Sequence, residues 1–199
     1  MNTTTLLPRQ ATGSYIPLAA WSFVAGAVLQ LVLGIPLAPL QAGSPIPIPV
    51  LGLNAASHLL LIGGVVGFAR SGAIGDGRHG RAGLVLTLLG LGALTLAEVV
   101  AMVDLDAATA FYAGATLVMA VGLVLSGVAV ARAGRWSGWR RFVPLACGLY
   151  VPLVLVPAFT LPGYAANYAI GVWGLCWLAW GVAMGFQGTR HRSRAVARA

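Results

Sequence analysis

The sequence predicts an all-α integral membrane protein with six transmembrane helices joined by short loops. Of its 199 residues, 59% are apolar and only 8% are charged, whereas about 25% of the residues of a soluble domain are charged. Six apolar runs are each long enough to cross the hydrocarbon core of a bilayer, which takes about 20 residues of helix. Every arginine lies between or outside these runs. Composition, run length and charge placement therefore agree on one fold class, with both termini in the cytoplasm.

The six predicted spans account for most of the chain. In order, they are residues 16–38, 50–69, 83–103, 108–131, 142–161 and 165–186. Residues 1–15 and the arginine-rich residues 188–199 are predicted as cytoplasmic tails, so residues 1–199 form a single six-helix transmembrane domain. Proline is frequent in the connection 39–49, which predicts an extended strap rather than a helix. Three prolines in the fifth span predict a kinked helix, the best candidate for lining a cavity.

The arginines predict the orientation of the chain and its surroundings. All 12 basic residues are arginines, and they fall on one side of the predicted membrane, which the positive-inside rule assigns to the cytoplasm. Arginine without lysine, together with abundant Ala, Gly, Val and Leu, indicates a GC-rich genome, so we expect a multi-pass protein of a bacterial plasma membrane. Topology explains the formal charge of +8 without nucleic-acid binding. Six arginines are expected to face anionic lipid headgroups at the inner interface: Arg132, Arg135, Arg140, Arg141, Arg190 and Arg192.

Tryptophans and small residues predict how the helices meet. Trp136 and Trp139 stand among arginines, as expected of side chains that anchor the inner interface. Three tryptophans share one face of the last span, where they pack against neighbours, face lipid or line a pocket. Small-xxx-small pairs such as Gly122 and Ser126 let helix backbones approach closely, and we expect most of this packing to occur within the monomer.

Polar side chains gather in the outer third of the predicted bundle. Glu98 is the only acidic residue well inside a span, and an ionisable group within the membrane is a functional candidate by default. His58 lies at a similar depth in the preceding span of the same hairpin. Gln30 and Tyr112 add polar groups from the first and fourth spans. These four residues form the candidate ligand or proton site.

Three interpretations of this polar layer remain open. In the first, His58, Glu98 and Gln30 bond one another and fix the order of the helices. In the second, the layer binds a small solute, a lipid or a proton from the outer side, because histidine and buried carboxylates exchange protons near neutral pH. In the third, His58 and Glu98 bind a metal ion together with Asp104. The third is the least favoured, because no second histidine stands at ligand spacing.

The sequence shows no catalytic constellation and calls for no cofactor or metal. It contains neither a P-loop nor a nucleophile elbow, and Cys147 and Cys176 lie in apolar runs as inert thiols. The favoured function is a small non-catalytic membrane component that acts as a homo-oligomer or as the partner of another membrane protein. One alternative is a small-solute or proton-coupled transporter or channel that uses the outer His/Glu site. A second alternative is an intramembrane enzyme.

Overall fold

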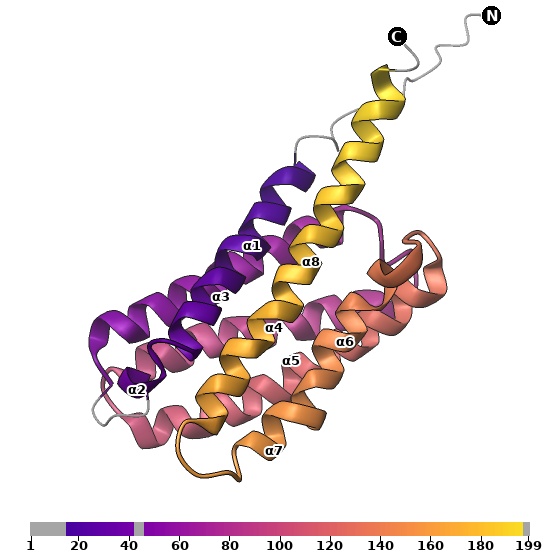
Figure 1. The fold of residues 1–199 in the computed structure, drawn as a ribbon. Helices are drawn as coiled ribbons and strands as arrows, with labels where there is room; N and C mark the ends of the chain where they lie inside the picture. Colours follow the sequence, from indigo (N-terminus) through magenta and orange to yellow (C-terminus); the bar gives the residue numbers. More distant parts are fainter. Residues whose placement is uncertain (1–14, 42–45, 197–199) are drawn as a thin grey trace, which may run out of the picture.

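The computed structural model describes residues 15–41 and 46–196, and the side chains of residues 16–41 and 46–186. Within these residues all regular secondary structure is helical (Figure 1). Six helical segments are long and apolar enough to cross a membrane, which confirms the predicted number of spans. The chain therefore has the architecture of a helical membrane protein.

Five of the six crossings are single continuous helices. They are α1 (Tyr15–Gly34), α3 (Ile48–Arg70), α4 (Arg78–Ala101), α5 (Leu105–Ala133) and α8 (Ala165–Val196). The fifth crossing is composite, and its parts are the 3₁₀ turn η1 (Gly138–Phe142), α6 (Val143–Tyr150), the π-helical segment η2 (Val151–Leu155) and α7 (Val156–Ala158). A short helix, α2 (Ala38–Gln41), precedes the second crossing.

The six crossings form a closed ring. Helix α1 packs against α3 and α8, α3 packs against α4, α4 against α5, α5 against α6, and α6 returns to α8. The beginning of α1 and the end of α8 lie at the same end of the bundle, whereas α2 and α7 lie at the opposite end (Figure 1). We call the first the arginine-rich end, because the connections 71–77 and 134–142 meet there, the first flanked by arginines and the second containing them. The other, with α2 and α7, is the proline-rich end.

The proline-rich connection differs from the prediction of an extended strap. Residues 38–41 form α2, because Pro39 occupies the first turn of this helix, where a missing N–H leaves no hydrogen bond unmade. The first span accordingly ends at Gly34, before the predicted boundary at residue 38. Pro49 lies in the first turn of α3 for the same reason. Residues 42–45 of the predicted strap lie outside the described residues.

The fifth crossing changes helix type where prolines interrupt its hydrogen bonding. Pro152 lies in the π-helical segment η2, and Pro157 lies in α7. A proline removes one backbone donor, so the carbonyl four residues earlier, which is that of Gly148 for Pro152, loses its usual α-helical partner. The indole Nε1 of Trp173 donates to the carbonyl of Cys147 at 2.9 Å, and the hydroxyl of Tyr150 donates to the carbonyl of Ala169 at 2.9 Å. Side chains thus satisfy backbone groups on both sides of the α6–α8 contact.

An aromatic cluster fills the bundle toward the arginine-rich end. Trp177 and Trp180 of α8 stack with ring centroids 5.5 Å apart, and Trp180 also meets Phe23 of α1 at 5.0 Å and Phe68 of α3 at 4.8 Å. Trp136 completes the cluster at 5.4 Å from Phe68. Of the three packing modes left open for the α8 tryptophans, the structure shows contact with neighbouring helices. Trp136 is buried, so its predicted role as an interface anchor is wrong. Trp139 is exposed, and its predicted role at the interface stays a prediction.

Small residues bring α4 and α5 into close contact. A Cβ atom added at Gly122 of α5 would lie 2.7 Å from the carbonyl oxygen of Gly83 of α4, and one added at Gly83 would lie 2.6 Å from the backbone nitrogen of Ser126. Neither backbone can move away, because both belong to continuous helices. The pair Gly122 and Ser126 therefore serves packing within the chain, as predicted.

Replacing Gly122 with leucine is expected to lower the free energy of unfolding by about 1–3 kcal/mol, because the side chain has no space against the α4 backbone. Gly114→Leu in the same helix is the matched control, since a Cβ atom there meets nothing within 4 Å. Thermal unfolding in mild detergent compares the two variants. Equal melting temperatures would refute the close α4–α5 contact.

Candidate functional site

The four predicted site residues lie toward the proline-rich end of four different helices. Gln30 is on α1, His58 on α3, Glu98 on α4 and Tyr112 on α5. The side chains of Gln30, His58 and Glu98 are buried, at 4%, 8% and 4% exposure, and Tyr112 is partly buried. We call these four residues the polar layer.

The structure brings two members of the polar layer together. The hydroxyl of Tyr112 lies close enough to the carboxylate of Glu98 for the two side chains to interact across the α4–α5 contact. This pairing follows from the antiparallel packing of α4 and α5, which sets residues near the end of one helix beside residues near the start of the other. Within the described residues, no hydrogen bond or ion pair joins His58 or Gln30 to this pair.

The threonines that precede Glu98 on α4 do not serve its carboxylate. The hydroxyl of Thr87 donates to the carbonyl of Gly83 at 2.8 Å, and that of Thr95 donates to the carbonyl of Leu91 at 2.9 Å. Such bonds to the preceding helical turn are usual for threonine in apolar surroundings. Both threonine hydroxyls therefore use their only donor within α4, and neither donates to Glu98.

Three polar atoms of the layer are buried and lack a partner among the described residues. They are Oε1 of Gln30, Nδ1 of His58 and Oε2 of Glu98. Buried polar atoms in native proteins are bonded in the large majority of cases, either to protein or to an enclosed polar species. Their concentration on three helices at one end distinguishes the layer from the other unpaired atoms, which are the hydroxyl of Ser126 and the indole nitrogens of Trp177 and Trp180.

A second polar cluster, which the sequence did not reveal, lies at the same end. The Nε2 of Gln41 in α2 donates to the carbonyl of Leu33, and the Nδ2 of Asn54 in α3 donates to Oε1 of Gln41 at 3.0 Å. These bonds tie α2 to the end of α1 and to α3. Asn54 precedes His58 by one helical turn. The cluster therefore fixes the backbone of α3 one turn away from the polar layer. The spacing of Asn54 and His58 indicates that they share one helix face. The contact with Gln41 could not be predicted, because Gln41 lies in a segment predicted as extended.

Asp104 has a structural role in place of the metal-binding role considered for it. Its carboxylate accepts a hydrogen bond from the backbone N–H of Ala107 at 2.9 Å and so caps the N-terminus of α5. Such a cap contributes about 1 kcal/mol to helix stability. No group of three or more His, Cys, Asp or Glu side chains that could hold a metal ion occurs in the described part of the chain.

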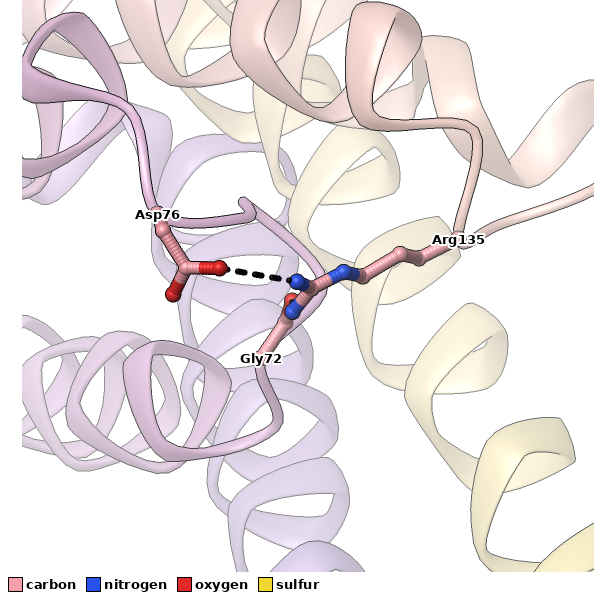
Figure 2. A network of polar contacts seen from close by, with 3 residues as sticks. All are labelled: Gly72, Asp76 and Arg135. Atoms are coloured by element: carbon pink, nitrogen blue, oxygen red, sulfur yellow. Dashed lines mark hydrogen bonds and ion pairs between the residues drawn. The ribbon is translucent and has the colours of Figure 1, made fainter.

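The predicted inner-interface arginines have different surroundings at the arginine-rich end. Figure 2 shows Arg135 reaching from the α5–α6 connection to the α3–α4 connection, where it donates to the carbonyl of Gly72 and pairs with Asp76 at 3.1 Å. Arg140 donates to the hydroxyl of Ser137, and Arg141 lies over the ring of Phe142. Arg132 is exposed at the end of α5. The side chains of Arg190 and Arg192 lie outside the described residues.

Comparison with protein-family models, curated proteins and solved structures gives no match to this chain. The geometry of the polar layer and of the arginine-rich end must therefore carry the functional argument.

Proposed function

We propose that the protein is a small non-catalytic component of a bacterial plasma membrane that binds a proton or a small polar solute in its polar layer. The observation that carries this proposal is the set of unpaired buried atoms on Gln30, His58 and Glu98. An enclosed polar species that bonds these atoms would remove the cost of burying them, which is about 1–3 kcal/mol for each unsatisfied group.

The proposed orientation places both termini in the cytoplasm and the polar layer toward the outer side. Arginines flank or occupy both connections at the arginine-rich end, whereas Asp104 and Asp106 lie at the start of α5, at the opposite end. Arginines retained on the cytoplasmic side are the feature that orients helical membrane proteins. The polar layer then receives its ligand from outside the cell.

The aromatic cluster favours a site that opens to one side of the membrane rather than a permanently open pore. Phe23, Phe68, Trp177 and Trp180 are fully buried and in mutual ring contact on the arginine-rich side of the polar layer. Interiors packed to this degree leave few voids as large as a water molecule. A proton or solute in the polar layer therefore exchanges with the proline-rich end.

Glu98 is the group proposed to take up and release the proton. Helix α4 packs against α3 and α5; on these neighbours the nearby titratable groups are Tyr112, which interacts with Glu98, and His58, which lies at the same end. No basic side chain on α3 or α5 is paired with Glu98 within the described residues. A buried carboxylate without a cationic partner is favoured in its neutral form, so proton exchange changes the charge of the layer.

Infrared difference spectroscopy during a pH titration tests this proposal. The wild-type protein is expected to show a carbonyl band of a protonated carboxyl group that disappears as the pH rises, and Glu98→Gln is expected to lack this band. Asp104→Asn and Asp106→Asn are the controls, because both carboxylates are exposed, and they should leave the band unchanged. A band that survives in Glu98→Gln, or a Glu98 band that never titrates, would contradict the proposal.

A proton-coupled transporter is the second candidate function, and the composite fifth crossing favours it. The π-helical segment η2 lies between α6 and α7, and π-helical turns within membrane helices often mark functional sites. Broken helices also line the substrate sites of many transporters. In this reading, bending at η2 alternates the access of the polar layer between the two sides.

Proton flux into liposomes distinguishes the two candidates. Binding at a one-sided site predicts no flux above that of protein-free liposomes when a pH gradient is applied. A transporter predicts flux that Glu98→Gln abolishes and Asp106→Asn retains. Equal flux in wild type and Glu98→Gln would exclude Glu98 as the carrier of the proton.

A further inference from the structure

A hollow of about 400 Å³ lies at the arginine-rich end, between the α3–α4 connection and the last turns of α5. Ile74, Val128 and Ala129 form apolar parts of its wall. Its acidic and basic side chains are Asp76, His79, Arg132 and Arg135. Sites for small molecules have volumes of about 300–1,000 Å³ and combine apolar walls with a few polar groups. The hollow has both properties.

The electrostatics of the hollow favour an anion. Two guanidinium groups oppose one carboxylate, and that carboxylate, on Asp76, is already paired with Arg135 (Figure 2). Arg132 makes no hydrogen bond or ion pair with the residues that the structure describes, so its guanidinium is available. The first turn of α4, which also lines the hollow, has no side-chain cap on its backbone N–H groups. Arg132 and the first turn of α4 line the same hollow.

The tie between Arg135 and the α3–α4 connection holds the hollow in shape. Arg135 bonds both the carbonyl of Gly72 and the carboxylate of Asp76, so it links two connections that are far apart in the sequence. Gly75, which lines the hollow, has a φ of 76°, a conformation that side chains other than glycine rarely adopt. The wall of the hollow thus depends on local backbone geometry as well as on charge.

The position of the hollow favours a lipid headgroup over a soluble anion as the ligand. It lies where α4 begins and α5 ends, at the boundary between the apolar spans and the connecting segments. Trp139, in the connection after α5, is 53% exposed, as is common for tryptophan at the level of lipid headgroups. A soluble anion would gain nothing from the apolar wall at Ile74 and Val128, whereas the glycerol and first methylenes of a lipid would lie against it.

We propose that this hollow binds the phosphate of an anionic phospholipid, with Arg132 and the first turn of α4 as its partners. Phosphate is well matched to guanidinium groups and to the backbone N–H groups of a helix start. The proposal requires that the helices cross the membrane, and it is independent of whether the polar layer binds a proton. Binding here would anchor the α3–α4 connection against the end of α5.

Native mass spectrometry of the protein released from nanodiscs containing equal amounts of phosphatidylglycerol and phosphatidylcholine tests the proposal. The wild type is expected to retain phosphatidylglycerol preferentially, and Arg132→Gln is expected to reduce this retention about fivefold. Arg81→Gln removes the same charge from an exposed position of α4 that does not line the hollow. This control variant is expected to retain the lipid as the wild type does.

Ala133→Leu tests the shape of the hollow independently of its charge, because the larger side chain fills the space beside Arg132 and changes no ionisable group. Loss of retention in Ala133→Leu, with the melting temperature within the range of Arg81→Gln, supports a site of defined shape. Equal retention of the two lipids by the wild type would overturn the proposal. Equal losses in Arg81→Gln and Arg132→Gln would also overturn it, by assigning retention to diffuse surface charge. Displacement of the lipid by inorganic phosphate would assign the hollow to a soluble anion.

Discussion

Within hydrocarbon, each backbone N–H and C=O group needs a partner inside the protein, and the arrangement of this chain follows from that requirement. In the five crossings that are single continuous helices, the hydrogen bonds of the helix itself meet this requirement. The fifth crossing contains prolines that remove donors, and it changes there to the π-helical segment η2, beside which Trp173 of α8 donates to the carbonyl of Cys147. Pro39 of α2 and Pro49 of α3 fall in first turns, where no donor is lost. The same requirement applied to side chains makes the unpaired atoms of Gln30, His58 and Glu98 the basis of the proposed function.

The spans could be predicted from the sequence because they depend on composition summed over many residues. The ends of the spans could not, since they depend on single local interactions. Asp104 caps α5 through one hydrogen bond, and α2 forms because Pro39 happens to occupy a first turn. Trp136 was misjudged for a related reason: its neighbours in sequence are arginines, but its neighbour in space is Phe68. The residues that neighbour Trp136 in the sequence do not predict its contact with a segment that is distant along the chain.

The members of the polar layer could be predicted from residue type and depth, and their relations could not. Whether Glu98 meets His58 or Tyr112 depends on the rotation of each helix about its axis, which the glycines of the α4–α5 contact fix. The hollow at the arginine-rich end was beyond prediction, because it forms between two connections that are distant in sequence and joined by Arg135. The proposed phospholipid site gives the predicted attraction of arginines to headgroups a particular place, beside Arg132.

The proposed function depends on an orientation in which the arginine-rich end faces the cytoplasm and the polar layer faces outward. Labelling of intact cells with a membrane-impermeant maleimide tests it most directly, using Asp106→Cys in the α4–α5 region and Gly77→Cys in the α3–α4 connection, both exposed positions. In this orientation, the cysteine at position 106 is labelled in intact cells and the one at position 77 is labelled only after lysis. Labelling of position 77 in intact cells, with position 106 protected, would show the opposite orientation and contradict the proposed function.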